Sequence, residues 1–426
     1  MNIHDSEKIA GMLKSLNYEE TETKEEADII VFNTCCIRES AEQKIMAKIG
    51  DIKALKKIKK DLIVVVCGCM TQQKNMKENL KKKFPFINII IGTHNIEELR
   101  NYILSLSAKK KTILDVWDKE KEIREDIKPY RTSKFNAWVN IMYGCNNFCT
   151  YCIVPYVRGR ERSRQVCDIV EEVKTLVESG NYKTITLLGQ NVNSYGLDFH
   201  DGKTNFVYLL NELCKIKGDF KIKFMTSHPK DFSPELIDFI ASNDKMSKSI
   251  HLPVQSGSNE ILKRMNRRYT VEKYKSLVDQ IYKKIPGATL TTDMIVGFPG
   301  ESDDDFKKTC DLIEYCKYIG VFGFVYSKRK GTPAEKFENQ VPINVKRERI
   351  TKLFEIQHRI SNEILQSMIN KKVEVLIEDE SELYFIAKTD SGKTVRINKD
   401  KDHKLGDICS VVIKKILSKQ LVGEIV

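Results

Sequence analysis

Three cysteines in one short stretch are the residues of this sequence best suited to chemistry. Cys145, Cys149 and Cys152 lie in the run GCNNFCTYC, and the next cysteine and histidine along the chain are Cys167 and His200. A closed structural zinc site normally uses four protein ligands in paired CxxC units. Three thiolates instead favour an iron-sulfur cluster that leaves one iron open to another molecule. A degenerate zinc knuckle is the alternative.

The CxxxCxxC spacing resembles the signature of the radical S-adenosylmethionine (SAM) superfamily. This resemblance implies that Cys145, Cys149 and Cys152 are the catalytic cysteines and hold a [4Fe-4S] cluster, whose open iron chelates SAM. One electron then cleaves SAM and gives a 5′-deoxyadenosyl radical. The resemblance also implies that Tyr151 contacts the adenine of SAM.

Length and composition set the class of protein. A chain of 426 residues can form two or three domains, and its 41% hydrophobic and 31% charged residues are typical of a globular protein. The longest apolar run, residues 62–70, is too short to cross a bilayer, and early charges such as Asp5 and Lys8 do not fit a signal peptide. Twelve cysteines without a disulfide pattern indicate a reducing compartment. We therefore expect a cytoplasmic monomer without a membrane partner.

Residues 1–111 show the alternation of an α/β domain. Because helices and strands alternate, we expect a doubly wound parallel sheet. The pattern begins with a helix that starts at Asp5 or Ser6, so the usual first strand is missing. The expected strands are 27–32, 62–66 and 87–91, and the expected helices after the first are 39–60, 72–84 and one from His94.

Cysteines follow the first two of these strands, as Cys35 and Cys36 and as Cys67 and Cys69. The carboxyl ends of neighbouring parallel strands meet at one edge, so these thiols could hold a metal together. The alternative is that they are small buried hydrophobic side chains. Twelve lysines against three acidic residues in the window 44–83 could bind nucleic-acid phosphates, or could solvate helix faces.

Several runs together resemble the methylthiotransferases, of the MiaB type, along the whole chain. They are Asn33-Thr34-Cys35, RESAEQK at 38–44, Gly68-Cys69-Met70 and residues 144–164. The resemblance implies a second, auxiliary [4Fe-4S] cluster held by three cysteines of the N-terminal domain. Cys35 and Cys69 match two of these ligands, and the third is missing from this sequence.

The missing ligand has two explanations. In the family the first cysteine comes just before a Met-Asn pair and an Asp-Ser-Glu helix start, which match Met1-Asn2 and residues 5–7 here. We therefore expect that the sequence starts late, at an internal methionine. If it does not, Cys36 or Cys67 would have to be the third ligand.

A charged linker at 112–134 precedes a central region, 135–368, with six expected strands and helices between them. Six strands match the open six-stranded barrel of radical SAM enzymes, and Ser302 with Asp305 forms a capping-box pattern at one helix start. The expected strands are 135–142, 184–188, 221–226, 248–252, 288–296 and 321–326.

Residues at the carboxyl ends of these strands resemble SAM contacts of the superfamily. Ile295 and Gly297 match the segment along the adenine, and Gln190 and Gln255 match positions near the ribose and methionine parts; purely structural loop roles are the alternative. Arginines 158, 160, 162 and 164 should lie on the rim of the site and bind tRNA phosphate or the SAM carboxylate. Salt bridges between elements are the alternative for them.

A long helix over 344–370 leads to a C-terminal region, 369–426, with five short strands at 373–377, 383–388, 394–397, 408–415 and 421–426. Short strands in so small a segment predict a small barrel of the nucleic-acid-binding kind. The region resembles the TRAM domain, which implies binding of tRNA.

Taken together, the resemblance implies radical methylthiolation of C2 of an N6-isopentenyladenosine at tRNA position 37, 3′ of the anticodon. An aromatic C–H bond offers no acid or base handle, which is why a radical is needed. A reductant such as flavodoxin or ferredoxin would supply the electron. The alternatives are a sister methylthiotransferase that acts on threonylcarbamoyladenosine or on a ribosomal protein, and a non-catalytic, metal-bound RNA-binding protein.

Overall fold

The computed structural model describes residues 1–36, 39–109, 112–119, 123, 127–417 and 420–426. The chain forms two compact units, each described separately below. The first unit comprises Met1–Thr132, Met142–Arg164 and Ser327–Glu335, and the second comprises Ser133–Ile141, Gln165–Tyr326 and Lys336–Val426. The three-cysteine loop therefore belongs to the same unit as the N-terminal region. The domain boundaries expected from the sequence remain a prediction.

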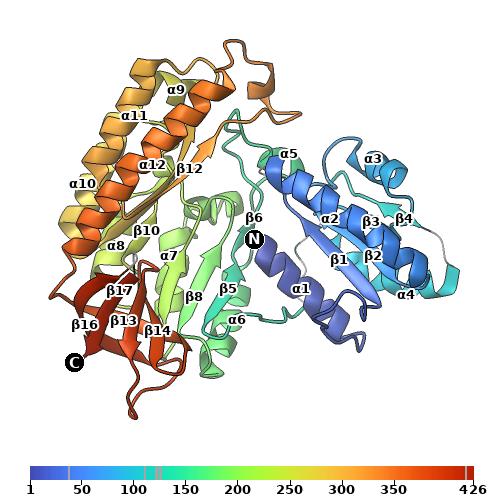
Figure 1. Cartoon of the computed structure of the whole chain (residues 1–426), viewed down its shortest axis with the longest axis horizontal. Helices are drawn as coiled ribbons and strands as arrows, with labels where there is room; N and C mark the ends of the chain where they lie inside the picture. Colours follow the sequence, from blue (N-terminus) through green and yellow to red (C-terminus); the bar gives the residue numbers. More distant parts are fainter. Residues whose placement is uncertain (37–38, 110–111, 120–122, 124–126, 418–419) are drawn as a thin grey trace. The chain divides into compact units, whose positions relative to one another are not determined.

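A parallel four-stranded sheet organises the first unit. Its strands are β1 (Ile29–Thr34), β2 (Ile63–Gly68), β3 (Ile89–Ile91) and β4 (Ile113–Asp115), in the spatial order β1-β2-β3-β4. The helices are α1 (Asn2–Lys14), α2 (Glu39–Ile58), α3 (Met76–Lys83) and α4 (Leu99–Lys109). Figure 1 shows them around the sheet.

Both faces of this sheet are covered, because its central strand is apolar on both sides. Val64 and Val66 of β2 pack in one core with residues of α2 and α3, whereas Val65 and Cys67 pack in a second core with residues of α1 and α4. A strand buried on both faces is typical of α/β folds. The predicted α/β fold of this region is confirmed.

Three local details differ from the sequence prediction. Strand β4 lies inside the range 112–134 that we predicted to be a linker, because three residues are too few to show a strand period. Helix α1 begins at Asn2 rather than at Asp5 or Ser6. Helix α3 begins at Met76 rather than at residue 72, since Asn75 has a left-handed backbone (φ +62°) that interrupts the helix.

Strand β1 is an edge strand of the sheet among the described residues. A groove of about 1010 Å³ runs along it, lined by residues of α1, of β1 and of the segment between them, and by Lys48, Asp51 and Ile52 of α2. The partly exposed pattern along all but the last residue of β1 agrees with this edge position.

Six parallel strands form the centre of the second unit. Strands β5 (Asn136–Asn140), β8 (Thr184–Leu188) and β9 (Lys221–Phe224) make one sheet, and β10 (Ser249–His251), β11 (Thr289–Val296) and β12 (Gly320–Val325) make another. A parallel bridge between Ile222 and Met246 joins β9 to the segment that leads into β10. All six predicted strands are present, and the open six-stranded barrel is confirmed.

Helices between these strands cover the outside of the barrel, and Figure 1 shows α10, α11 and α12 side by side next to β10–β12. Ser302 and Asp305 form the predicted capping box at the start of α11. No helix within the described ranges has both the length and the apolar character needed to cross a bilayer. The helices are α6 (Val166–Glu178), α7 (Phe206–Cys214), α8 (Pro234–Ser242), α9 (Asn259–Arg264), α10 (Val271–Lys284), α11 (Asp303–Cys316) and α12 (Ile343–Gln366).

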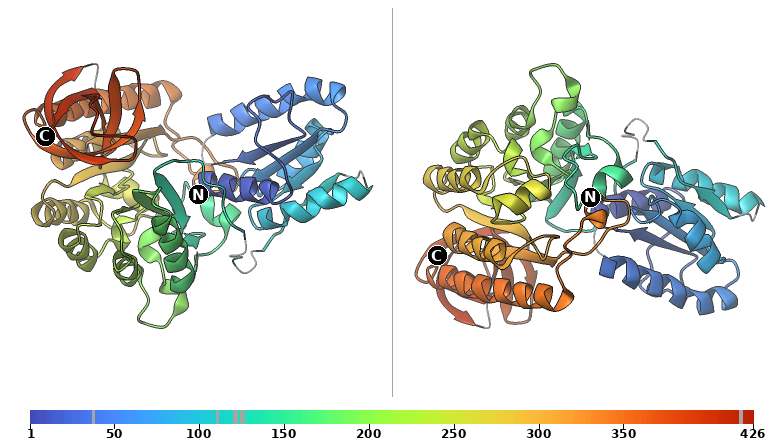
Figure 2. Two further views of the ribbon diagram at one scale, coloured as in Figure 1. Left: turned by 90° about the horizontal axis from the view of Figure 1, so that it is seen from below. Right: turned by 90° about the horizontal axis from the view of Figure 1, so that it is seen from above.

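The C-terminal strands close into a small barrel, as Figure 2 shows in red. They are β13 (Lys372–Glu380), β14 (Tyr384–Thr389), β15 (Thr394–Asn398), β16 (Ile408–Leu417) and β17 (Gln420–Ile425), in the order β13-β14-β15-β17-β16. Alternate residues such as Val375, Ile377 and Val411 fill its core.

Asp390, in the turn between β14 and β15, ties this barrel to the larger one. Its carboxylate accepts hydrogen bonds from the Ser247 hydroxyl (2.8 Å) and the Lys248 backbone N–H (2.8 Å), and pairs with Lys223 at 3.2 Å. All five C-terminal strands were predicted, and this joint was not.

Candidate iron-sulfur and SAM site

The three-cysteine loop is bracketed by a two-stranded antiparallel ribbon, in which Met142–Tyr143 (β6) pairs with Arg162–Ser163 (β7). A short helix, α5 (Val154–Arg158), follows the last cysteine. Gly144 starts the loop with φ +76°, and a side chain there would collide with the carbonyl of Arg160. Glycine is therefore required for the tight turn that presents the cysteines.

Backbone hydrogen bonds hold the loop that carries the thiols. The N–H of Cys145 donates to the Gly159 carbonyl at 3.2 Å, and the N–H of Cys152 donates to the Cys149 carbonyl at 2.9 Å. The side-chain amide of Asn147 lies 3.6 Å from the Cys145 sulfur. Burial raises the pKa of the Cys145 thiol to about 11. This thiol must therefore lose its proton before it can bind iron.

Among the described residues, no three or more His, Cys, Asp or Glu side chains surround a single metal position. A cluster does not require such convergence, because each thiolate binds a different iron. Three cysteines on one loop can therefore hold a cluster without converging on a single point.

Aromatic side chains line the same loop. Phe148, between the first two cysteines, has a left-handed backbone (φ +46°), and its ring lies beneath the guanidinium of Arg160 at 4.5 Å and edge-on to Tyr156 at 5.9 Å. Tyr151 lies between Cys149 and Cys152 and is half-buried. These rings can keep water away from a cluster, which affects its reduction potential.

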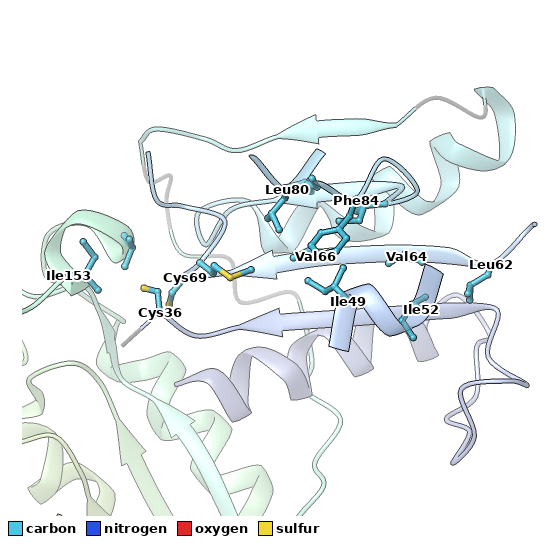
Figure 3. Packing of buried hydrophobic residues seen from close by; sticks show 14 residues of the cluster. Cys36, Ile49, Ile52, Leu62, Val64, Val66, Cys69, Leu80, Phe84 and Ile153 are labelled. Carbon is cyan, nitrogen blue, oxygen red and sulfur yellow. The ribbon is translucent and has the colours of Figure 1, made fainter. Parts of the chain in front are cut away.

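A second group of thiols lies at the carboxyl ends of β1 and β2. The thiol of Cys36 donates a hydrogen bond to the sulfur of Cys69, and both side chains belong to one buried cluster, drawn in Figure 3. Ile153, which directly follows Cys152 of the loop, packs in the same cluster. Cys35 is half-buried, and Cys67 packs on the opposite face of the sheet. Parallel pairing thus brings Cys36 against Cys69, while the pairing of Cys35 with Cys69 as metal ligands remains a prediction.

The environment of Cys69 favours its thiolate form. The hydrogen bond from Cys36, together with the charge and the N–H of Arg158, lowers the pKa of Cys69 to about 6. The same hydrogen bond and burial raise the pKa of Cys36, and burial raises that of Cys67. The N–H and the charge of Arg158 thus favour the thiolate form of Cys69, which is the form that binds a metal.

Arg158 is a residue whose role we did not predict. We expected it on the rim of the site with arginines 160, 162 and 164, with salt bridges between elements as the alternative. The Arg158 and Arg164 residues are only 8% and 5% exposed. Arg158 pairs with Asp5 at 2.6 Å, and its Nε donates to the sulfur of Cys69 at 3.2 Å. Of the other two arginines, Arg160 is exposed and Arg162 is half-buried. The rim prediction is wrong for Arg158 and Arg164.

Two of the residues predicted to contact SAM lie side by side in the second unit. Gln255, after β10, has φ +75° and continues the pairing with β11, since its N–H donates to the Asp293 carbonyl and its carbonyl accepts from the Ile295 N–H, both at 2.9 Å. Gln255 and Ile295 are thereby hydrogen-bonded neighbours near the carboxyl end of β11.

Gln190, a third predicted contact, follows β8. Its side-chain oxygen is buried without a hydrogen-bond partner among the described residues, and so are the side-chain oxygen of Asn191 and the side-chain nitrogen of Asn193. Buried amides without partners are costly, so they indicate a place for a polar ligand or water. Three such atoms follow one barrel strand, and the SAM contact of Gln190 remains a prediction.

Gly297, the fourth predicted SAM contact of the second unit, directly follows β11 and has φ +68°. A side chain at this position would collide with Lys346. Its N–H donates to the carboxylate of Glu301 at 2.6 Å, and Arg349 pairs with the same carboxylate at 2.7 Å. Burial raises the pKa of Glu301 to about 7. Glu301 and Arg349 thus fix the turn after β11.

Comparison with known proteins identifies three regions of the chain. Residues 139–313 match the radical SAM superfamily, residues 366–426 match the TRAM domain, and residues 1–92 match a family described as "Uncharacterized protein family UPF0004". The matches to the first two agree with the open barrel and the small C-terminal barrel.

Relatives match over the whole chain. A protein of Clostridium tetani named tRNA-2-methylthio-N(6)-dimethylallyladenosine synthase is 50% identical over 427 residues, which cover 100% of this chain and 94% of the relative. A protein of Acetivibrio thermocellus with the same name is 48% identical, and the match covers 100% of this chain and 89% of that protein.

Solved structures support the fold alone. The radical SAM methyltransferase TsrM of Kitasatospora setae is 14% identical with a TM-score of 0.54, and the match covers 76% of this chain and 65% of that one. The cobalamin-dependent SAM radical enzyme OxsB is 15% identical with a TM-score of 0.53, over 84% of this chain and 53% of that one.

An open parallel barrel and a CxxxCxxC loop in one chain define a radical SAM protein, which implies a [4Fe-4S] cluster and SAM as cofactors. Within that class, the chain belongs to the MiaB-type methylthiotransferase family. The family predicted from the sequence is thereby confirmed.

Proposed function

We propose that this protein is a tRNA-2-methylthio-N6-dimethylallyladenosine synthase, which replaces the C2 hydrogen of N6-isopentenyladenosine at tRNA position 37 by a methylthio group. Full-length relatives that carry this name at about 50% identity support the substrate. The TRAM match at 366–426 supports tRNA as the partner. The base would have to leave its stack to reach the barrel, as in other enzymes that act on bases.

In this proposal Cys145, Cys149 and Cys152 hold the cluster that binds SAM, and Tyr151, Gln190, Gln255, Ile295 and Gly297 contact SAM. When bound, the cluster supplies the electron that cleaves SAM reductively. The buried amides after β8 orient the polar end of SAM, and the rings of Phe148 and Tyr151 exclude water from the loop.

Cys35 and Cys69, together with a third ligand that is missing from this sequence, would hold the auxiliary cluster. The observation that supports the proposal is the presence of two groups of thiols in one compact unit. They are linked by the contact of Arg158 with Cys69 and by the packing of Ile153 in one cluster with Cys36 and Cys69. A plain radical SAM enzyme needs the first site, whereas a methylthiotransferase needs a second site that handles sulfur.

We further propose a cytoplasmic monomer that takes its electrons from flavodoxin or ferredoxin. The twelve free cysteines support a reducing compartment.

The test is an anaerobic reaction of protein reconstituted with iron and sulfide. Dithionite, SAM and an isopentenylated anticodon stem-loop are added, and both the nucleosides and 5′-deoxyadenosine are measured by mass spectrometry. The expected products are the 2-methylthio nucleoside and 5′-deoxyadenosine. A stem-loop with threonylcarbamoyladenosine should give no product, and turnover of that substrate instead would replace the proposed one.

A further inference from the structure

Arg158 connects the three-cysteine loop with the strand-end cysteines. It is the last residue of α5, which begins two residues after Cys152, and its side chain is 8% exposed. The guanidinium reaches two groups from other parts of the first unit: the Asp5 carboxylate of α1 at 2.6 Å, through Nη2, and the Cys69 sulfur at 3.2 Å, through Nε.

A purely structural ion pair does not require this second contact. Asp5 accepts from Nη2 and so balances the charge of the arginine, while the separate Nε–H points at sulfur. Sulfur is a weak acceptor when it is protonated, and it becomes a good one as a thiolate or a metal-bound thiolate. Cys36 donates to the same sulfur, so Cys69 accepts two hydrogen bonds.

We propose that Arg158 is a positioning residue that fixes the Cys69 sulfur against the three-cysteine loop and sets the reduction potential of the cluster bound to Cys69. Hydrogen bonds to the sulfurs and nearby charge are known determinants of cluster potentials. A donated hydrogen bond and a positive charge both stabilise the cluster after it gains an electron, so Arg158 raises the potential. This inference rests on the proposed function, because it requires that Cys69 binds a cluster.

A substitution of Asp5 should shift the reduction potential of this cluster in the opposite direction to a substitution of Arg158. The Asp5 carboxylate lies on the far side of the guanidinium and offsets part of the positive charge that Cys69 experiences. Removing this charge while keeping Arg158 should raise the potential, whereas removing the N–H donor should lower it. Damage to the fold alone has no reason to shift the potential in opposite directions in the two variants.

The experiment isolates the second cluster by changing Cys145, Cys149 and Cys152 to alanine in the full chain. The protein is reconstituted anaerobically with iron and sulfide, and a redox titration followed by electron paramagnetic resonance gives the midpoint potential. Arg158→Lys, which loses Nε and keeps a charge, should lower the ratio of reduced to oxidised cluster at a fixed potential by about tenfold, which is 59 mV for one electron. Asp5→Asn should raise this ratio.

Arg131→Lys is the matched control. Arg131 pairs at 2.9 Å with Glu7, which lies in α1 as Asp5 does, and its side chain is as buried as that of Arg158. The control should leave the midpoint unchanged. Should the triple alanine protein bind no cluster at all, Cys69 holds no cluster in this chain, and the second site of the proposed function fails together with the inference about Arg158. If it binds a cluster but Arg158→Lys and Asp5→Asn leave the midpoint unchanged, or shift it in the same direction, only the inference about Arg158 is overturned. Arg158→Gln, which is uncharged, provides the same comparison if Arg158→Lys does not fold.

Discussion

The two groups of thiols in the first unit are built in different ways. Cys145, Cys149 and Cys152 lie within eight residues on one loop, and local backbone hydrogen bonds with the tight turn at Gly144 shape it. Cys36 and Cys69 are 33 residues apart in sequence and meet because β1 and β2 are parallel neighbours.

The difference also appears in proton affinity. Burial without a charged hydrogen-bond donor raises the pKa of Cys145 to about 11, whereas hydrogen bonds from Cys36 and Arg158 lower that of Cys69 to about 6. A loop can supply thiols at the right spacing, but a charged donor that stabilises one of them has to come from elsewhere in the fold.

The largest effect is expected when a ligand of the three-cysteine loop is removed. Cys145→Ala removes one of three proposed ligands, so formation of 5′-deoxyadenosine from SAM should fall by more than about 100-fold, the upper loss for changes in outer-shell partners. Mass spectrometry of the reduced reaction measures it. Cys167→Ala, an exposed cysteine outside the loop, is the control and should keep normal activity. Activity of Cys145→Ala within twofold of the unmodified protein would contradict the assignment of the loop.

Changing the strand-end group should separate the two halves of the reaction. Cys69→Ala is expected to keep 5′-deoxyadenosine formation but to lose the methylthio product, with bound iron falling by about half, because one of two [4Fe-4S] clusters is lost. Iron analysis and nucleoside analysis measure these effects. Cys67→Ala changes a thiol of the same strand that faces the other core, and should retain both clusters. Equal iron in Cys69→Ala and the unmodified protein would argue against a second cluster on Cys69.

A smaller effect concerns pH. Raising the pH from 7 to 9 increases the thiolate fraction of a group with a pKa of about 11 by about 100-fold and hardly changes it for a pKa of about 6. The sign follows because the raised pKa of Cys145 lies above this pH window, whereas the lowered pKa of Cys69 lies below it. Iron-sulfide loading of Cys69→Ala, in which only the loop remains, should therefore accelerate over this range. The loading rate of the triple alanine protein should change little over the same pH range. A similar increase of the loading rate with pH in both proteins would show that thiol ionisation does not limit loading.

The smallest effect should come from the joint of the C-terminal barrel, far in sequence from both thiol groups. Asp390→Asn weakens the charge-assisted bonds to Ser247, Lys248 and Lys223, so the free energy of unfolding of the second unit should fall by about 1–3 kcal/mol. Urea unfolding measures this change. Asp379→Asn, an exposed aspartate of β13, should cost less. A loss of iron in Asp390→Asn would reveal a dependence of the clusters on this joint.

Much of the fold could be predicted because its signals are local. The five C-terminal strands and six barrel strands show short apolar runs or alternating apolar residues, and the capping box of Ser302 depends on a residue three positions away. Strand β4 escaped prediction because three residues carry no period, and α3 was predicted too long because the left-handed backbone of Asn75 is not evident from its residue type.

The sequence alone determined the family, the order of elements and the spacing of the three-cysteine loop, since each depends on residues close together along the chain. Only the tertiary structure decided that Cys36 rather than Cys67 lies against Cys69, and that Arg158 faces a sulfur and not solvent. The physical reason is that side-chain direction at a strand end and the burial of a charge depend on which distant elements pack there. Those contacts leave no periodic trace in the sequence.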